Sequence, residues 1–274
     1  MIFKYIKQNL RNFSFNIILL WLAILVYNKT PYYSNFLHLT TQKILFLLAL
    51  AYTAIGFFYY IFNSSKVLED SKGILIFNLF KKILFNNLLN IKNKPALEHK
   101  EKTAALFAIV KFFFLPLMIN FAINNFNTIN YYFDLIQNPI STISFDSNFF
   151  NAIIFPLAIA LVFFIDTAYF SFGYIFEAKF LKNKVRSVEP TLLGWSVALA
   201  SYPPFAFYIT KYLDWYADDM VEFSEPAITL TMRIIILLLF AIYLSATIAL
   251  GAKCSNLTNR GIVSRGRVWD RKTI

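Results

Sequence analysis

The sequence predicts an all-α protein that crosses a membrane about six times and carries short interfacial helices between its spans. Composition is the first reason: 58% of the 274 residues are hydrophobic, 15% are charged, and the mean hydropathy is +0.55. Soluble domains are only about half apolar and about a quarter charged. Patterning is the second reason, because the charged residues gather between long apolar runs. Together these observations exclude an ordinary soluble domain.

The first predicted span begins close to the N-terminus. Met1–Phe13 is expected to form a basic amphipathic helix on the membrane surface, because its lysines and arginine recur at helical spacing opposite apolar residues. It leads into the apolar run Phe13–Tyr27. No small-residue cleavage site follows this run, so we interpret it as an uncleaved helix and not as a signal peptide. Ile44–Phe62, the second span, is uncharged and has about the 20 residues that a bilayer requires.

An interfacial helix and a third span complete an N-terminal membrane region, residues 1–148. In Gly73–Ile91, two lysines and two asparagines gather on one side of a helical wheel, and apolar residues cover much of the rest. This pattern is typical of a helix that lies in the membrane surface. Ala104–Ile123 is the third span, although it contains a lysine and a proline, and the residues that follow it, 124–148, contain neither lysine nor arginine.

A second membrane region, residues 149–251, contains three further spans. They are Phe149–Phe176, Leu192–Ile209 and Ala227–Gly251. The first of these is long enough to tilt or to project beyond the bilayer. The second contains Pro203 and Pro204, which remove two backbone donors, so we expect a kink or break there.

The charge distribution predicts how these spans are oriented. Of the 26 lysines and arginines, three lie in the N-terminal segment, eight in residues 63–103, four in residues 177–191 and six in the tail, residues 252–274. In a six-span arrangement all four segments lie on one side, which the positive-inside rule identifies as the cytoplasm, so both termini are cytoplasmic. The net charge of +11 favours anionic lipids as partners and not nucleic acid, because the basic residues do not gather on a polar domain.

Several classes of site are not indicated by the sequence. Cys254 is the single cysteine, which excludes an internal disulfide framework, and the two isolated histidines give no zinc site. No Ser/His/Asp set, Walker loop or dinucleotide fingerprint occurs. Two basic residues within spans, Lys111 and Arg233, are expected to snorkel towards the nearer surface, Arg233 towards the acidic loop Thr210–Pro226.

Asp166 is the acidic residue that the sequence singles out within a span. It lies near the middle of Phe149–Phe176, where a short carboxylate cannot reach water unaided. The residues that follow it on the same helix face are Tyr169, Gly173, Tyr174 and Glu177. Two interpretations stay open. Either this face lines a polar cavity that opens to the cytoplasm and receives a lipid head group, or Asp166 hydrogen-bonds to a neighbouring helix and holds the bundle together.

Two stretches of the chain resemble a known family. Ser255–Gly266, and Arg186–Trp195 with Ser201–Phe205 after it, are similar to parts of bacterial members of the isoprenylcysteine carboxyl methyltransferase and phospholipid methyltransferase superfamily. The resemblance extends over residues 153–266. It implies S-adenosylmethionine as the cofactor, a prenylated or lipid substrate, and the bacterial inner membrane as the location. The family's Arg-His-Pro-x-Tyr cofactor signature is absent from Arg267–Ile274, so we expect a truncated and inactive relative.

The face of Asp166 and the resemblance together indicate candidate site residues. They are Glu177 and Arg260 for catalysis, Asn256, Asn259 and Arg260 for the cofactor, and Asp166, Tyr174, Glu189, Trp195 and Tyr202 for the substrate. Structural alternatives stay open: Thr191 fits an N-cap after Glu189-Pro190, and a basic tail after a last span is ordinarily an anchor. The competing functions are a non-enzymatic transport or scaffold protein, in which Asp166 and Glu177 line a pathway, and a nonfunctional product of a broken gene.

Overall fold

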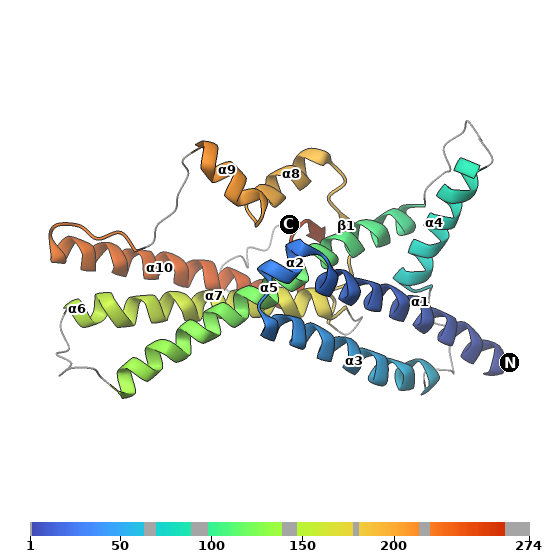
Figure 1. The fold of residues 1–274 in the computed structure, drawn as a ribbon, viewed down its shortest axis with the longest axis horizontal. Coiled ribbons are helices and arrows are strands. Elements are labelled where there is room, and N and C mark those ends of the chain that lie inside the picture. The colour runs from blue at the N-terminus through green and yellow to red at the C-terminus, as the bar shows by residue number, and fades with distance from the viewer. Residues whose placement is uncertain are drawn as a thin grey trace, which may run out of the picture. The chain divides into compact units, whose positions relative to one another are not determined.

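The computed structural model describes residues 2–62, 70–88, 98–138, 147–177, 181–213 and 220–260, and within these ranges it is almost entirely helical (Figure 1). Five of its helices are long and apolar enough to cross a membrane, and a bent pair of short helices makes up to six. The predicted all-α membrane architecture is therefore confirmed. The chain divides into two compact units, Met1–Pro116 and Leu117–Ile274.

In the first unit, the predicted surface helix and first span form one continuous helix. They are joined in α1 (Ile2–Lys29), which packs along α3 (Leu39–Phe62), with α2 (Pro31–Phe36) between them. Polar side chains cross the interface between α1 and α3, since Trp21 Nε1 donates to Thr53 Oγ1 at 3.2 Å. Asn16 Nδ2 also donates to Tyr60 Oη at 3.0 Å, and the rings of Phe13 and Phe57 pack edge to face between the same two helices.

The helix α4 (Lys72–Leu88) corresponds to the predicted interfacial helix, and asparagines of α1 cap its start. Asn12 Oδ1 accepts from the Ser71 backbone N–H at 2.7 Å, and Asn16 Oδ1 accepts from that of Gly73 at 3.1 Å. These bonds satisfy N–H groups that a helix start leaves unpaired. A Cβ at Gly73 would lie 2.6 Å from Asn16 Oδ1, so the close approach requires glycine.

The helix α5 (His99–Gln137) is longer than predicted, with 39 residues. The third span was expected to end at Ile123, and that prediction of its end is wrong, because the helix continues through the polar run after it. Side chains there bond back to the helix: Asn125 Nδ2 donates to Phe121 O at 2.8 Å and Thr128 Oγ1 to Asn124 O at 3.0 Å. Polar residues that bond within their own helix do not end it.

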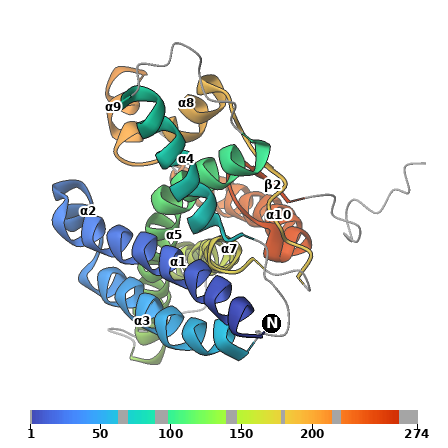
Figure 2. The same cartoon turned by 90° about the vertical axis from the view of Figure 1, so that its right-hand side faces the viewer.

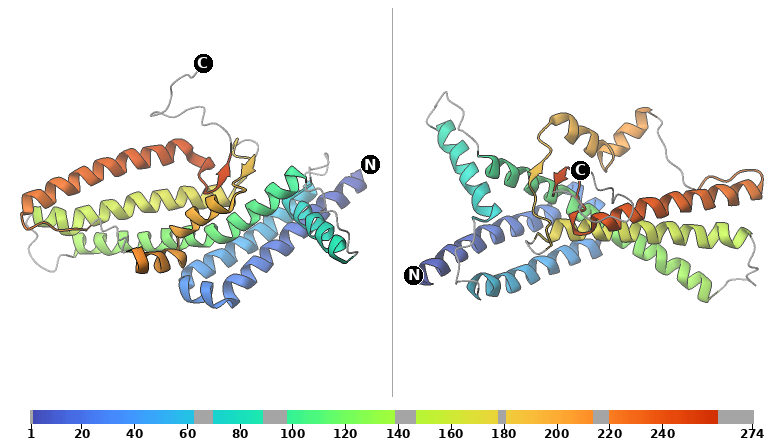
Figure 3. Two further views of the ribbon diagram at one scale, coloured as in Figure 1. Left: turned by 90° about the horizontal axis from the view of Figure 1, so that it is seen from above. Right: turned by 180° about the vertical axis from the view of Figure 1, so that it is seen from behind.

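In the second unit, two long helices lie side by side (Figure 3). The first is built from α6 (Ser147–Phe149), the π-helix η1 (Phe150–Ile154) and α7 (Phe155–Ile175), and the second is α10 (Pro226–Leu250) with the short 3₁₀-helix η2 (Gly251–Lys253). Residue numbers rise together along the contacts between the two helices: Asn151 contacts Arg233, Phe163 contacts Phe240, and Asp166 contacts Thr247. The helices α7 and α10 therefore run parallel.

Parallel neighbours require the connecting chain to return from one end of the pair to the other. That connection contains α8 (Leu192–Ala200) and α9 (Phe205–Leu213), which meet at an angle of 78°. The predicted break at Pro203-Pro204 is confirmed, since the helix stops before the two prolines and resumes after them. Each nine-residue helix is only about 14 Å long, so neither spans a bilayer alone.

A two-stranded sheet joins two distant parts of the second unit. The strand β1 (Ser187–Val188) precedes α8, and β2 (Thr258–Asn259) follows α10 and η2 (Figure 2). The strands are antiparallel, with Ser187 opposite Asn259 and Val188 opposite Thr258. Arg186 N–H donates to Asn259 O and Glu189 N–H to Leu257 O, both at 2.8 Å, which extends the pairing by one bond on each side.

Candidate functional site at the end of α7 and α10

A cluster of polar side chains lies where α7 and α10 end and the β1–β2 sheet begins. Gly173 allows this arrangement, because a Cβ there would overlap with the carbonyl oxygen of Cys254. The turn after α10 thus lies directly against α7. Cys254 is itself buried, and burial raises the pKa of its thiol to about 12, so the thiol stays protonated at neutral pH.

Asp166 bonds to α10. Its Oδ1 accepts from Thr247 Oγ1 at 2.7 Å, and the phenol of Tyr243, one turn earlier on α10, faces the same carboxylate. In the described part of the chain no lysine or arginine pairs with Asp166. Thr247 is three residues from the end of α10, so Asp166 bonds to the last turn of its partner helix. The hydrogen bond matches the interpretation that Asp166 holds two helices together.

Asn256 links α7 to the break between α8 and α9. Its backbone N–H donates to Tyr174 Oη at 2.7 Å, and its side-chain Nδ2 donates to Tyr202 Oη at 3.0 Å. Tyr174 is only 1% exposed. The structure therefore brings together two predicted substrate residues and one predicted cofactor residue, through bonds that the sequence did not indicate.

Arg260 and Glu177 stabilise the loop between α7 and β1. Arg260 is buried, and it donates from Nε to Ser255 Oγ at 2.8 Å and from Nη1 to Asn183 O at 3.2 Å. Burial lowers the pKa of its guanidinium, and the negative charge of Glu177 acts in the opposite direction. Glu177 Oε1 accepts from the Val185 N–H at 3.0 Å. Both candidates for catalysis thus bond to backbone of the same loop.

Glu189 and Trp195 form a separate group at the start of α8. Glu189 Oε1 accepts from the Thr191 N–H at 2.9 Å and from the Thr191 hydroxyl, and these bonds hold the pKa of Glu189 below its usual range. Trp195 Nε1 donates to Glu189 O at 2.8 Å, and Thr191 Oγ1 accepts from the Gly194 N–H at 3.1 Å. Thr191 is therefore the N-cap that the sequence indicated, and Glu189 and Trp195 bond to the same helix start.

Sequence reasoning missed Asn183, which is fully buried. Its Nδ2 donates to Phe176 O at 2.8 Å and to Ala252 O at 3.1 Å, so one amide joins the end of α7 to η2. An asparagine in a polar loop carries no signal of such a role. The third predicted cofactor residue, Asn259, lies in β2, where its backbone oxygen accepts from Arg186.

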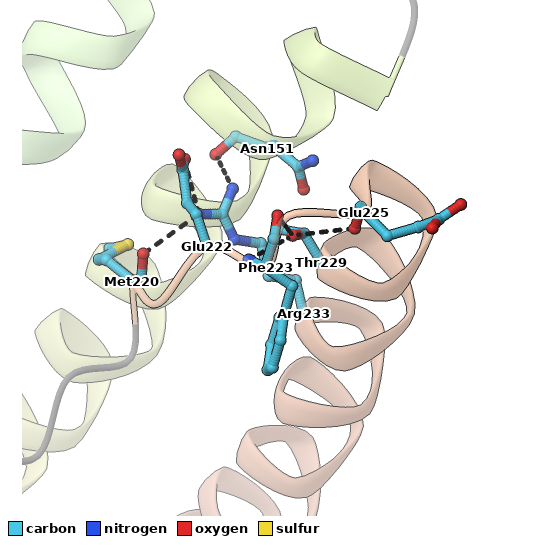
Figure 4. Close-up of polar contacts among 7 residues, drawn as sticks. All are labelled: Asn151, Met220, Glu222, Phe223, Glu225, Thr229 and Arg233. Carbon is cyan, nitrogen blue, oxygen red and sulfur yellow. Dashed lines mark hydrogen bonds and ion pairs between the residues drawn. The ribbon is translucent and has the colours of Figure 1, made fainter.

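A second polar cluster lies at the opposite end of the α7–α10 pair, around Arg233 (Figure 4). Arg233 is 3% exposed, and its Nη1 donates to Asn151 O at 2.8 Å. Its Nη2 lies 3.4 Å from Met220 O and 3.4 Å from Glu222 Oε1. Its guanidinium carbon lies 5.1 Å from the centre of the Phe155 ring. The expected contact with the acidic loop is present, but the shortest bond goes to the π-helix.

The chemistry at the first cluster is that of hydrogen bonding within the protein. Asn256 and Arg260 donate to oxygens of the chain itself, so an S-adenosylmethionine carboxylate would have to replace Ser255, Asn183 or Tyr202 as their acceptor. In this arrangement Asn256 and Arg260 do not fit the cofactor, and Asn259, whose side chain is exposed, is the candidate left to hold it. The expected truncated end, residues 261–274, lies outside the described residues.

Comparison of the chain with protein families, with curated proteins and with solved structures finds no match.

Proposed function

We propose that this chain is an inner-membrane protein related to the S-adenosylmethionine-dependent methyltransferases that modify lipid or prenylated substrates at the cytoplasmic face. The pairing of β1 with β2 is the observation that carries the proposal. The two stretches that resemble that family are about 70 residues apart, and the sheet joins them residue by residue. Tyr202, in Ser201–Phe205, bonds to Asn256 in Ser255–Gly266. Segments inherited together as one functional module are expected to pack together in this way.

The parallel helices support the proposed membrane orientation. Because α7 and α10 run in the same direction, the chain between them crosses the bilayer once, so the bent pair α8–α9 belongs to a sixth crossing. Six crossings place both termini on one side. The 21 lysines and arginines predicted for that side favour the cytoplasm, which supports a position of the polar cluster at the inner surface.

The role proposed for the polar cluster is recognition of an amphiphile. The hydroxyls of Tyr174 and Tyr202, the amide of Asn256 and the Asp166 carboxylate gather where α7 and α10 end, and the apolar helices α8 and α9 lie between Tyr174 and Asn256 in the chain. We derive no methyl-transfer step, because the candidate cofactor residues bond to the chain itself. Binding is therefore the property to measure.

The experiment is equilibrium binding of S-adenosylmethionine to the full chain purified in detergent. We expect saturable binding that weakens at least tenfold in Asn259→Ala, whose side chain is exposed and whose backbone bonds are unaffected by the substitution. Lys184→Ala, another exposed polar residue of the same loop region, is the matched control and should bind like the parent protein. A folded parent protein that binds no S-adenosylmethionine contradicts the cofactor proposal.

A transport or scaffold role is the second candidate, and the broken crossing favours it. Discontinuous helices at membrane depth commonly mark transport sites. Tyr202, at the break, bonds to Asn256, which also bonds to Tyr174 on the helix that carries Asp166. If Asp166→Asn changes solute flux into proteoliposomes while the protein binds no S-adenosylmethionine, the transport role is supported in place of the methyltransferase relationship.

A further inference from the structure

The Arg233 cluster contains a buried donor and a buried acceptor that have no partner among the described residues. Arg233 Nε and Asn151 Oδ1 both lack a hydrogen bond, although each atom is shielded from solvent (Figure 4). An unpaired buried polar atom costs about 1–3 kcal/mol. Two complementary atoms of this kind within one cluster point to a ligand that both accepts and donates.

The geometry of the guanidinium shows which ligand chemistry fits. Nε and Nη2 form one edge of the arginine fork, the edge that binds a phosphate or carboxylate through two parallel bonds. On this edge Nε is unpaired, and Nη2 has only contacts of 3.4 Å, to Met220 O and Glu222 Oε1. A charge-assisted bond is about 2.7–2.9 Å long, so the edge is poorly satisfied. Nη1, on the other edge, makes the short bond to Asn151 O.

The position of Arg233 along α10 brings its side chain within reach of lipid head groups. It follows Pro226 by seven residues, about 10 Å, and precedes Thr247 by 14 residues, about 21 Å. A hydrocarbon core is about 30 Å thick. With Asp166 and Thr247 near one boundary, Arg233 lies near the other, within reach of a phosphate.

The neighbouring carboxylate of Glu222 indicates which group the ligand carries besides its phosphate. The Glu222 side chain is 77% exposed and 3.4 Å from Arg233, whose own side chain is 4% exposed, so the carboxylate can move aside while the guanidinium stays. A purely anionic head group would be repelled by Glu222. A head group with a phosphate diester and a primary ammonium complements both charges, and its N–H groups could also reach Asn151 Oδ1.

We propose that the Arg233 cluster binds the head group of an aminophospholipid from the leaflet at this end of α10. The phosphate lies on the Nε–Nη2 edge of Arg233, in the place that Glu222 approaches, and the ammonium group pairs with Glu222 and the amide oxygen of Asn151. This site is at the opposite end of the α7–α10 pair from the cluster of the proposed function and is independent of it.

The test measures the thermal unfolding midpoint of the full chain in phospholipid-free detergent. Four probes are added in turn: dihexanoyl phosphatidylethanolamine, dihexanoyl phosphatidylglycerol, dihexanoylglycerol and inorganic phosphate. We expect the ethanolamine lipid to raise the midpoint most and the glycerol lipid less, while dihexanoylglycerol and inorganic phosphate have no effect. Equal responses to both phospholipids and dihexanoylglycerol, or a response to inorganic phosphate equal to that of the lipid, overturn the proposal.

Two variants test whether Arg233 and Glu222 are the residues that bind the head group. Arg233→Lys keeps the charge but removes the two-donor edge, so the apparent affinity for the ethanolamine lipid should fall at least tenfold. Glu222→Gln changes an exposed side chain, so the variant should fold even if the first does not, and its response to the glycerol lipid should rise to that of the ethanolamine lipid. The proposal fails if neither phospholipid raises the unfolding midpoint of the folded parent protein, or if Glu222→Gln still prefers the ethanolamine lipid to the glycerol lipid. In either case water is the hydrogen-bond partner of Arg233 Nε and Asn151 Oδ1.

Discussion

The two ends of α10 bury opposite charges in different ways. At the Pro226 end, the Arg233 guanidinium reaches backbone oxygens of two segments, η1 and the loop before α10. At the Leu250 end, the Asp166 carboxylate of α7 reaches the hydroxyl of Thr247. An arginine has five N–H donors and can bond to any backbone carbonyl within reach. A carboxylate needs a donor, and within a helix the backbone N–H groups are already bonded, so only side chains supply one.

The difference predicts where substitutions are tolerated. At the Arg233 end the guanidinium donates to backbone carbonyls, which every residue has. The residues that supply these carbonyls can therefore be exchanged, whereas Arg233 cannot. At the Asp166 end both partners are side chains, so both should be sensitive. Five substitutions or pairs of substitutions test this contrast by their effect on the free energy of unfolding in detergent.

Arg233→Gln should have the largest effect, a loss of about 3–4 kcal/mol. The substitution leaves the carbonyl oxygens of Asn151 and Met220 without their donor, and a buried unpaired acceptor costs about 1–3 kcal/mol. Denaturant titration measures it, with the exposed Lys211→Gln as the matched control. Glu222→Gln should cost less than about 0.5 kcal/mol, because exposed ion pairs contribute little. Equal losses in Arg233→Gln and Glu222→Gln would contradict the contrast.

Gly173→Ala should destabilise the Leu250 end by about 3 kcal/mol. Its Cβ would overlap with the backbone oxygen of Cys254, and backbone cannot move aside as a flexible side chain can. Gly56→Ala is the control, since the nearest atom there belongs to the Phe13 side chain, at 3.1 Å, and the loss should stay within about 1 kcal/mol. If both variants unfold at the same denaturant concentration, the close approach of α7 to the turn after α10 is not important for stability.

Asp166→Asn and Thr247→Val should each cost about 1–2 kcal/mol, and the double variant should cost less than their sum. The two side chains share one bond of 2.7 Å, so removing either removes it, and the coupling energy should be about 1 kcal/mol. A double-mutant cycle measures this value. Losses that add to within about 0.3 kcal/mol would show that the two residues act independently.

Tyr202→Phe should cost about 1 kcal/mol, because it removes the acceptor of the Asn256 amide and keeps the ring. Tyr212→Phe, at a side chain that is 80% exposed, is the matched control and should stay within about 0.5 kcal/mol of the parent. The same denaturant titration compares them. A loss in Tyr212→Phe as large as that in Tyr202→Phe would mean that the hydroxyl of Tyr202 has no special role.

Glu189→Gln should have the smallest effect, and the effect should depend on pH. Hydrogen bonds from Thr191 hold the pKa of Glu189 below that of the unfolded chain. Its contribution is therefore present above the unfolded pKa and disappears as pH falls through the folded pKa. The difference in unfolding midpoint between parent and Glu189→Gln should shrink from about pH 6 to about pH 3. In a Thr191→Val background the pH dependence should weaken, and an unchanged dependence there would assign it to other groups.

The helices were predictable because length and hydropathy are local properties. The second span was expected at Ile44–Phe62 and is Leu39–Phe62, and the break at two prolines follows from chemistry that needs no partner. The end of α5 was not predictable in this way, since asparagine and threonine favour both loops and bonds to their own helix. Only the structure shows which of the two occurs.

The candidate site was predictable only in part. Periodicity placed Asp166, Tyr174 and Glu177 on one face of α7, and all three lie in or beside the polar cluster. The face is connected to Asn256 by the bond from the Asn256 backbone N–H to Tyr174 Oη, and the β1–β2 sheet beside it is held by backbone atoms, so neither leaves a pattern in the side chains. Asn183 shows the same limit, because its two acceptors are carbonyls of distant residues.

The parallel arrangement of α7 and α10 has a consequence for synthesis. Asp166 and Thr247 are 81 residues apart, and a ribosome adds about 5–20 residues per second, so the carboxylate waits on the order of 4–16 s before its partner emerges. During that interval α7 is in or at the membrane with an acidic group that nothing from α10 covers. We expect the translocon or an insertase to hold α7 until α10 arrives.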